Sequence, residues 1–347
     1  MRKNYYFLVN DTRYDNHHGC LTVIKNLEMA MIERDWLCCG SLPVSSDVQA
    51  LSRHQDAINK ADLVIVNGEG SLHHDKRNAN RLFDICCLLQ ETKPVVLINA
   101  LWQENDPVKW TPILKHFKAI YVRDKQSLNM LEELSIVANY APDLTFYSYP
   151  QISKQKTAHK NYGITDSVIN KWAERALAYA KHNDNVDFLT MFTGRLTYRS
   201  GVKGHLKHFK YGLYPILSKT LGIPVPPRYK SLEYAVSDTH EFLRILKQYD
   251  AVCVARYHAL CFVIQQEVPF VAIASNSHKS ESLIAEIGLP VNLFMASPKE
   301  INDDKHTLSE KLEYSAIHFQ EYRMKVKDFK HQAKLELDSM FTHITNV

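Results

Sequence analysis

The sequence predicts an α/β protein with doubly wound parallel sheets, and three observations carry this prediction. Short β-branched runs alternate with segments of helical period, which is typical of parallel strands with covering helices. The runs at residues 63–66 and 95–98 are continuously apolar, as expected of strands that are buried on both faces. The chain has 347 residues, of which 45% are hydrophobic, so its length fits about two domains, each with a substantial core.

A polar stretch at residues 148–160 divides the chain into two such series. The expected strands are residues 5–9, 61–67, 94–99 and 119–122 in the first series, and residues 162–165, 187–192, 251–255 and 270–274 in the second. The polar stretch has the composition of a linker. We therefore expect two Rossmann-like domains, at residues 1–150 and 161–305, that face a cleft where open α/β sheets bind ligands. In a transferase this arrangement is called GT-B.

The remaining residues, 306–347, predict a C-terminal helical segment, either one long charged helix or a helix pair. Its basic residues are Arg323, Lys325, Lys327, Lys330 and Lys334. The helix face that carries these residues either packs across the two domains with its charges solvated, or contacts an anionic membrane surface. A second basic run, at residues 195–210, is either a solvated face or a receptor for an anionic or lipid-linked acceptor.

The composition excludes several classes of protein. The formal net charge of +4 is too small to indicate nucleic-acid binding. The seven cysteines are odd in number and show no C-x-x-C spacing, so neither a disulfide framework nor a zinc site is expected. No stretch reaches the roughly 20 apolar residues that span a bilayer, and the first apolar run ends too early for a signal peptide. We expect a cytoplasmic protein without a metal or other cofactor.

The strongest local signal is a glycine loop that directly follows the expected strand 61–67. Gly68 and Gly70 allow the backbone to turn sharply and to approach a ligand, which makes them candidate donor-binding residues. Glu69 between them would lie at the carboxyl end of the strand, as a candidate catalytic group. The alternative is a plain turn with a solvated Glu69. His73, farther along the loop, is expected to form hydrogen bonds or face a phosphate rather than bind a metal.

A second carboxylate, Asp143, follows Pro142 at the end of the first series. One interpretation is a helix cap. The other pairs Asp143 with Glu69, since retaining sugar transfer uses one carboxylate as nucleophile and one as acid or base. Nearby, Arg123 and Asp124 are expected to form an internal ion pair.

The second series ends its strands with candidate anion-binding residues. Arg256 and His258 follow the expected strand 251–255 and open a helix, whose free N–H groups favour negative charge. Ser277, His278 and Lys279 follow the next strand and supply further donors. Two polar clusters after consecutive strands predict a phosphate or carboxylate site.

The first loop after a strand is also long and polar. Arg13, His17 and His18 are candidate contacts to an acidic substrate. Asp11 either takes part in the same contacts or only braces the loop.

Together these residues resemble the polysaccharide pyruvyl transferase superfamily of bacterial envelope biosynthesis. The resemblance rests on the opening strand and its polar loop, the glycine loop at 68–70, residues 122–124 with Ser127 and Leu131, residues 142–143, and the stretch from Arg256 to Lys279. It implies two Rossmann-like domains and, in pyruvyl transferases, a phosphoenolpyruvate donor. It also implies that Arg256 and His258 take part in donor binding and proton transfer.

One departure from the family pattern refines this resemblance. Pyruvyl transferases usually carry three glycines where this chain has Gly68, Glu69 and Gly70. The loop with a glutamate is similar to that of a branch of retaining β-Kdo transferases, which move 3-deoxy-D-manno-octulosonic acid (Kdo) from CMP-Kdo. In that branch the roles implied are nucleophile for Asp143 and catalytic partner for Glu69.

The resemblance leaves three hypotheses for the function. The first is a glycosyltransferase of bacterial surface polysaccharide, either lipopolysaccharide O-antigen or capsule, that transfers Kdo to a free or lipid-linked glycan. The second is a pyruvyl transferase that forms ketals on a glycan. The third is a non-catalytic protein that binds glycans or nucleotides. The carboxylate of Glu69 is awkward beside phosphoenolpyruvate, and this favours the first hypothesis.

Overall fold

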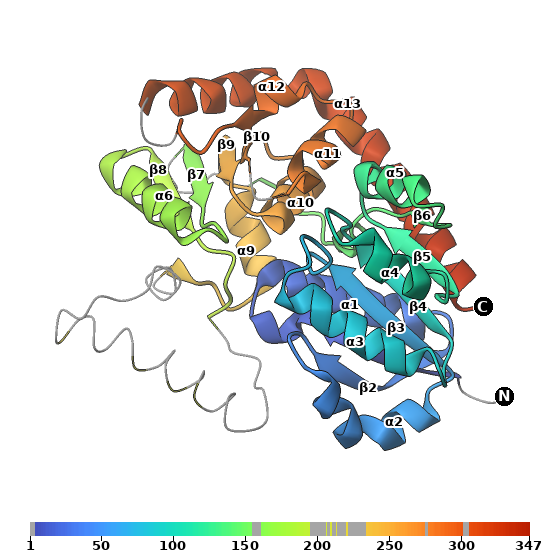
Figure 1. Cartoon of the computed structure of the whole chain (residues 1–347). Helices are drawn as coiled ribbons and strands as arrows, with labels where there is room; N and C mark the ends of the chain where they lie inside the picture. The colour runs from blue at the N-terminus through green and yellow to red at the C-terminus, as the bar shows by residue number, and fades with distance from the viewer. Residues whose placement is uncertain are drawn as a thin grey trace. The chain divides into compact units, whose positions relative to one another are not determined.

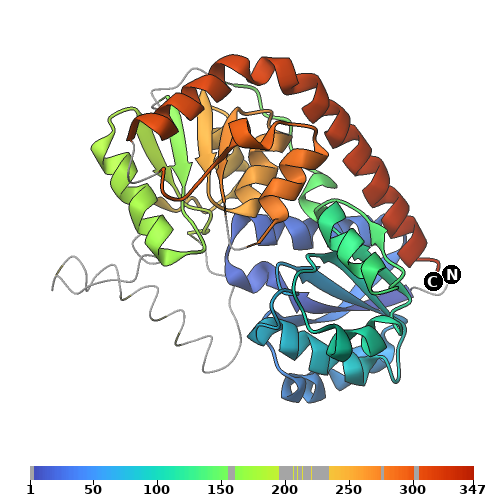
Figure 2. The same ribbon diagram turned by 45° about the horizontal axis from the view of Figure 1, so that its top comes forward.

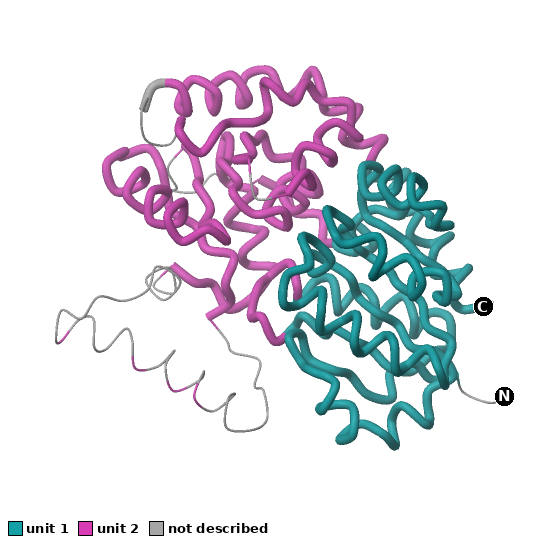
Figure 3. Tube along the Cα trace, viewed as in Figure 1, with its two compact units in different colours: residues 1–13, 21–148, 330–347 teal, residues 14–20, 149–329 magenta. Residues whose placement is uncertain are grey.

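A computed structural model describes residues 4–154, 161–194, 234–274, 277–300 and 305–347, and the single residues 206, 209, 213 and 220. The chain divides into two compact units (Figure 3). Unit 1 comprises residues 1–13, 21–148 and 330–347, and unit 2 comprises residues 14–20 and 149–329. The units differ from the sequence division into 1–150, 161–305 and 306–347 in that residues 14–20 are in unit 2 and the C-terminal segment is shared. Most of the basic run at 195–210 lies outside the described residues.

Unit 1 holds a parallel sheet of six strands in the order β2-β1-β3-β4-β5-β6, with helices on both faces (Figure 1). The strands are β1 (Asn4–Asp11), β2 (Trp36–Pro43), β3 (Leu63–Glu69), β4 (Val95–Ala100), β5 (Ala119–Val122) and β6 (Asn139–Tyr140). The α-helices are α1 (His18–Ile32), α2 (Gln55–Lys60), α3 (Arg77–Leu89), α4 (Pro107–Leu114) and α5 (Lys125–Glu133), with 3-10 turns at η1 (Thr12–Asp15), η2 (Val48–His54) and η3 (Leu144–Phe146).

The sequence explains why the middle of this sheet forms. Every residue of β3 and β4 is buried, as the continuous apolar runs predict for strands covered on both faces. The strand expected at 61–67 runs instead over Leu63–Glu69, so Glu69 is itself the last residue of β3. The sequence did not indicate β2, an edge strand with only two buried residues.

Unit 2 holds a second parallel sheet, of five strands in the order β11-β10-β9-β7-β8. The strands are β7 (Tyr162–Thr165), β8 (Val186–Leu189), β9 (Ala251–Val254), β10 (Phe270–Ile273) and β11 (Met295–Ala296). The helices that the structure describes there are α6 (Asn170–His182), α9 (Thr239–Leu246), α10 (Tyr257–Gln265), α11 (Lys279–Glu286) and α12 (Val291–Phe294). Helix α10 is buried along its whole length, which fits its apolar composition.

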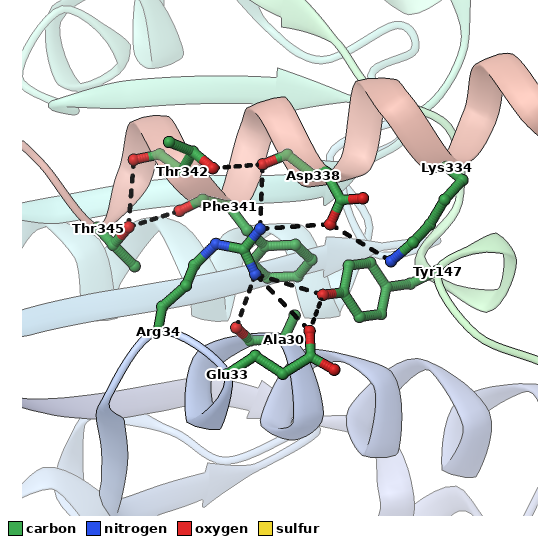
Figure 4. Close-up of polar contacts among 9 residues, drawn as sticks. All are labelled: Ala30, Glu33, Arg34, Tyr147, Lys334, Asp338, Phe341, Thr342 and Thr345. Atoms are coloured by element: carbon green, nitrogen blue, oxygen red, sulfur yellow. Dashed lines mark hydrogen bonds and ion pairs between the residues drawn. The ribbon is translucent and has the colours of Figure 1, made fainter.

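The C-terminal segment is one continuous helix, α13 (Lys305–Ile344), rather than a helix pair (Figure 2). Its last turns pack in unit 1 through Arg34, whose Nη2 donates to Asp338 Oδ1 at 3.3 Å and whose guanidinium lies over the ring of Phe341 (Figure 4). Lys334 lies over the ring of Tyr147 in the same cluster. This geometry ties the end of the chain to α1.

Two basic residues of α13, Arg323 and Lys325, contact unit 2, to which they belong. Arg323 Nε donates to Glu267 Oε2 at 2.6 Å, and Lys325 Nζ donates to the carbonyl of Gly288 at 2.8 Å. These contacts favour the packing interpretation of the basic face, and a membrane contact stays a prediction. Among the described residues, no helix is both long and apolar enough to cross a bilayer.

Candidate functional site

The carboxyl edge of the unit 1 sheet carries a cluster of buried polar residues with unusual backbone. Asn10, Glu69 and Asn99 end or nearly end the adjacent strands β1, β3 and β4, with φ angles of 65°, 42° and 55°. Residues other than glycine rarely adopt this left-handed region, which costs about 1–3 kcal/mol each. Such strain is characteristic of functional sites, because the surrounding structure must enforce it.

Glu69 is buried, and a chain of asparagines orients its carboxylate. Asn67 Nδ2 donates to Glu69 Oε2 at 3.2 Å, and Asn67 Oδ1 accepts from Asn99 Nδ2 at 3.2 Å. Asn99 Oδ1 in turn accepts from the backbone N–H of Leu144 at 3.4 Å. The alternative of a solvated Glu69 is therefore wrong, because the side chain is held inside a polar network.

The two glycines of the loop meet different neighbours. A Cβ atom on Gly68 would lie 2.7 Å from the Cα of Ala100, so this glycine is required by the close approach of β4. A Cβ atom on Gly70 would lie 3.6 Å from Arg123 Nη2, which is an ordinary contact. The loop thus passes directly beside the guanidinium of Arg123.

Asp143 is fully buried and forms an ion pair with Arg123. Its Oδ2 accepts from Arg123 Nη1 at 2.9 Å, and its Oδ1 accepts from the backbone N–H of Thr145 at 3.0 Å, which caps η3. The cap interpretation is confirmed. The guanidinium compensates the charge of the carboxylate inside the protein.

Arg123 forms an ion pair with Asp143, and Asp124 has a structural role of its own. Asp124 accepts from the backbone N–H of Ser127 at 2.8 Å and from its hydroxyl at 2.7 Å, so it caps α5. The backbone at Asp124 is extended, and successive side chains of an extended chain point to opposite sides. Arg123 therefore points toward Asp143 while Asp124 points toward α5.

These contacts bring both candidate carboxylates into one network of unit 1. Glu69 reaches the amide after Asp143 through Asn67 and Asn99, and the loop after Glu69 lies beside the arginine that holds Asp143. An oriented buried carboxylate is suited to nucleophilic or proton-transfer chemistry.

The other candidate residues of unit 1 are held by neighbouring elements of the protein. Asp11 Oδ1 accepts from Arg13 Nε at 2.8 Å, and Asp11 Oδ2 accepts from the Ser41 hydroxyl at 2.8 Å. Arg13 also pairs with Glu28 at 2.5 Å. The bracing interpretation of Asp11 is thus confirmed, and it extends to Arg13. His73 is buried, and its backbone forms a parallel bridge with Gln103 in the loop after β4.

In unit 2, Arg256 is the N-cap residue of α10 and its guanidinium is held from two sides. Its Nη2 donates to Asp166 Oδ2 at 2.7 Å and to the carbonyl of Ser167 at 3.2 Å. The guanidinium also lies over the ring of Phe192, with its central carbon 4.7 Å from the ring centroid. Arg256 is therefore a fixed cation at a helix start, where the helix dipole also favours an anion.

The neighbouring strand leads to a second helix start. Strands β9 and β10 are adjacent and parallel, so α10 and α11 begin at the same edge of the sheet. His278 is the N-cap residue of α11, Lys279 is its first residue, and Ser277 is buried just before it. The two polar clusters therefore do follow adjacent strands, as the sequence predicts.

Residues 14–20 place both candidate histidines of the first loop in unit 2. The ring of His17 lies 5.6 Å from that of His258, centroid to centroid. His18 is fully buried, stacks on Phe242 at 4.6 Å and forms a hydrogen bond with the Thr239 hydroxyl at 3.0 Å. Burial lowers the pKa of His18 to about 4, although Asp238 opposes the shift. His18 thus acts as a neutral packing residue.

Sequence reasoning did not identify Asn67, Asn99 or Asp166. Each lies at or just beyond the carboxyl end of an expected strand, which is the same signal that selected Glu69. Applying that signal to every polar residue at a strand end would have found all three.

Solved structures of low sequence identity share the fold. Staphylococcus aureus MnaA in a UDP co-structure is 11% identical with a TM-score of 0.53, over 96% of this chain and 97% of that one. The UDP-GlcNAc 2-epimerase of Methanocaldococcus jannaschii is 10% identical with a TM-score of 0.52, over 90% and 93% of the two chains. These similarities confirm the expected fold class, two parallel-sheet α/β domains of the GT-B type with a C-terminal helix.

The sequence comparisons concern the family. No curated protein sequence matches this chain. The family model described as polysaccharide pyruvyl transferase matches residues 3–277, which includes the glycine loop, Asp143, Arg256 and His258. By this match over most of its length, the chain belongs to the polysaccharide pyruvyl transferase family.

Proposed function

We propose that the protein is a retaining glycosyltransferase that moves Kdo from CMP-Kdo to a glycan acceptor of the bacterial surface. The observation that carries this proposal is that Glu69 is linked through Asn67 and Asn99 to the backbone amide that directly follows Asp143, so two buried carboxylates lie in one polar region of unit 1. Retention through two inversions needs a carboxylate nucleophile and a second group for proton transfer. The resemblance of the glutamate-containing loop to β-Kdo transferases supports the same assignment.

In the first step, Asp143 attacks the anomeric carbon of the donor. The bond between that carbon and the phosphate oxygen breaks, and CMP leaves with the electron pair. Arg123 and the Thr145 amide hold the carboxylate in place for this attack. In the second step an acceptor hydroxyl attacks the same carbon, Glu69 takes the hydroxyl proton, and the Asp143 carboxylate is released.

Unit 2 binds the anionic part of the donor in this proposal. Arg256 is fixed by Asp166, and the starts of α10 and α11 add backbone N–H groups at the same sheet edge. His258, Ser277, His278 and Lys279 supply further polar groups there. A structure of the M. jannaschii epimerase, which shares this fold, is a complex with UDP-GlcNAc and UDP, and this supports a nucleotide-linked donor.

Pyruvyl transfer from phosphoenolpyruvate is the second candidate, and the family match itself favours it. Both donors carry a carboxylate and a phosphate, so the Arg256 cluster serves either one. The two functions differ in unit 1, because a ketal-forming pyruvyl transferase needs no covalent adduct on Asp143.

Calorimetry with CMP and with phosphoenolpyruvate separates the two candidates, because a ligand that binds the folded state produces a binding heat and raises the unfolding temperature. We expect CMP to bind and phosphoenolpyruvate to bind weakly or not at all. Intact-protein and peptide mass spectrometry after incubation with CMP-Kdo alone should show one Kdo mass on the peptide that contains Asp143. Binding of phosphoenolpyruvate without a response to CMP would overturn the Kdo assignment and support pyruvyl transfer.

A further inference from the structure

We propose that His17, Cys20 and His258 form a zinc site inside unit 2, with a fourth coordination position open to a ligand. The three side chains are buried, and each offers one ligand atom within 4.8 Å of the other two. The sequence analysis expects no zinc site, because these ligands have no metal-binding spacing: His17 and Cys20 lie around the start of α1, and His258 lies in α10, more than 230 residues later. The inference concerns metal binding itself, and it gives His258, which the proposed function places near the anionic part of the donor, the role of a metal ligand.

The backbone fixes the loop that carries His17. His17 forms an antiparallel bridge with Phe192, the N–H of His18 donates to the Met191 carbonyl at 2.9 Å, and the N–H of Thr193 donates to the Asn16 carbonyl at 2.9 Å. Asn16 has a φ angle of 54°, so the loop turns sharply just before the first ligand. These contacts place His17 against unit 2 before any ion binds.

Gly19 brings the other two ligands together. A Cβ atom on Gly19 would lie 2.2 Å from the Cβ of His258, so the first turns of α1 and α10 meet at the one position that lacks a side chain. Cys20 follows Gly19 directly, and its side chain therefore starts next to the helix turn that carries His258. The close packing of the two helix starts defines the distance between the thiol and the imidazole.

The donor set suits Zn²⁺. Two imidazole nitrogens and one thiolate match the borderline-soft preference of zinc, with bonds of about 2.0–2.1 Å to nitrogen and about 2.3 Å to sulfur. A tetrahedral ion with such bonds separates its ligand atoms by roughly 3.3–3.7 Å. Ligand atoms within 4.8 Å of one another need only a small contraction to reach this geometry. The Nδ1 atom of His17 accepts from the Gly19 N–H at 3.2 Å, and because an imidazole nitrogen has a single lone pair, an ion bound at this atom would replace that hydrogen bond.

Three protein ligands leave one tetrahedral position for an exogenous group. The thiolate cancels one of the two charges of the ion, so the site keeps a net positive charge that favours an anionic ligand. Arg256 lies over the same Phe192 ring that His17 contacts edge-on, and its own charge is compensated by Asp166. A carboxylate or phosphate oxygen is therefore the chemical class of ligand that we expect in the open position.

Cobalt substitution tests this site on the full-length protein. Titration of the metal-free protein with Co²⁺ should give one equivalent of tetrahedral d–d absorption and a thiolate-to-cobalt charge-transfer band. The Cys20→Ser variant should lose the charge-transfer band and bind Zn²⁺ at least about 10-fold more weakly. Cys38→Ser is the matched control, since Cys38 is exposed and lies in unit 1, and it should behave like the wild type.

X-ray absorption on the zinc-loaded wild type needs no variant, and it should show one sulfur and two imidazole ligands. The proposal is overturned if the wild type gives no charge-transfer band with Co²⁺, or if the band persists in a folded Cys20→Ser protein. It is also overturned if the absorption spectrum shows only oxygen and nitrogen ligands. None of these outcomes depends on turnover, so a failed zinc site and a failed Kdo assignment are distinguishable.

Discussion

Both units place an arginine and an aspartate at the carboxyl ends of adjacent parallel strands, and in both the two side chains form an ion pair. In unit 1, Arg123 follows β5 and pairs with Asp143 beyond β6 at 2.9 Å. In unit 2, Arg256 follows β9 and pairs with Asp166 beyond β7 at 2.7 Å. The same arrangement, an arginine–aspartate ion pair at the carboxyl ends of adjacent strands, thus occurs in both units.

The arginine is the more exposed partner in both pairs, but the two pairs differ in how exposed that arginine is. The side chains of Arg123 and Asp143 are 2% and 0% exposed, and the backbone amide that follows Asp143 ends a chain of hydrogen bonds that leads to Glu69. The side chain of Arg256 is 10% exposed, whereas that of Asp166 is 2% exposed and also accepts from the Met191 N–H. We infer that the arginine supports the carboxylate in unit 1 and that the carboxylate supports the arginine in unit 2.

Exchanging each aspartate for asparagine tests this division of roles most strongly. Asp143→Asn should lower turnover with CMP-Kdo by at least about 10³-fold, because the variant lacks the proposed nucleophile. Donor affinity should stay within about threefold, because the residues proposed to bind the anionic part of the donor lie in unit 2. Initial rates and calorimetry on the folded variant, checked by circular dichroism, give both numbers. Substantial turnover by Asp143→Asn would make this aspartate structural.

Removing the arginine of unit 1 should mainly lower stability. Arg123→Met leaves a fully buried Asp143 without its countercharge, which costs about 3–5 kcal/mol of unfolding free energy. Replacing both partners, as Arg123→Met with Asp143→Leu, should recover most of the loss, since an apolar pair needs no countercharge. Urea unfolding measures the effect.

The matched control is Arg34→Met, also in unit 1. Its ion pair with Asp338 is 19% and 41% exposed and should be worth at most about 1 kcal/mol. Equal losses for Arg123→Met and Arg34→Met would contradict the claim that burial distinguishes the Arg123 pair.

The sequence predicts the sheets well where strands are apolar and buried. The strand expected at 119–122 is β5 residue for residue, and that at 162–165 is β7. It does not predict β2, where the residues Cys38 to Ser41 give neither an apolar run nor alternation. It does not predict β6 or β11 either, because strands of two residues are too short for any period.

The site is less predictable because its contacts join distant segments. Glu69 could be selected because it follows an expected strand, and Asp143 because it follows Pro142 at the end of the first series. The partner of Arg123 could not be predicted, since the two-residue β6 brings Asp143 beside it across the sheet. The assignment of residues 14–20 to unit 2 depends on tertiary contacts of His17 and His18 that no local pattern encodes.

Acid should act on unit 2 through His18. Its pKa in the folded protein is about 4, below the ordinary 6.5. Between these two values the unfolded chain binds a proton on His18 and the folded protein does not. The stabilisation is complete above the unfolded pKa and is lost as the pH falls toward 4. Lowering the pH from about 7 to about 5 should therefore reduce the free energy of unfolding by about 2 kcal/mol through His18. Urea unfolding at both pH values should show a smaller loss for His18→Gln, and equal losses would show that His18 does not carry the effect.

The smallest expected effect concerns Asp166, which holds Arg256, and it tests the comparison between the two pairs in unit 2. Asp166→Asn removes one charge from the partner of Arg256 but keeps an acceptor of the same size. Because Arg256 is partly exposed, water can compensate its charge, so we expect little loss of stability. Donor affinity should fall by about 3–10-fold, since the guanidinium loses its charge-assisted hydrogen bond and is less well oriented. Calorimetry with CMP measures the change, beside Asp143→Asn as the unit 1 counterpart. If Asp143→Asn weakens CMP binding as much as Asp166→Asn does, the inferred difference is wrong. The Arg123–Asp143 pair would then not serve catalysis alone, and the Arg256–Asp166 pair would not be the distinct binding pair.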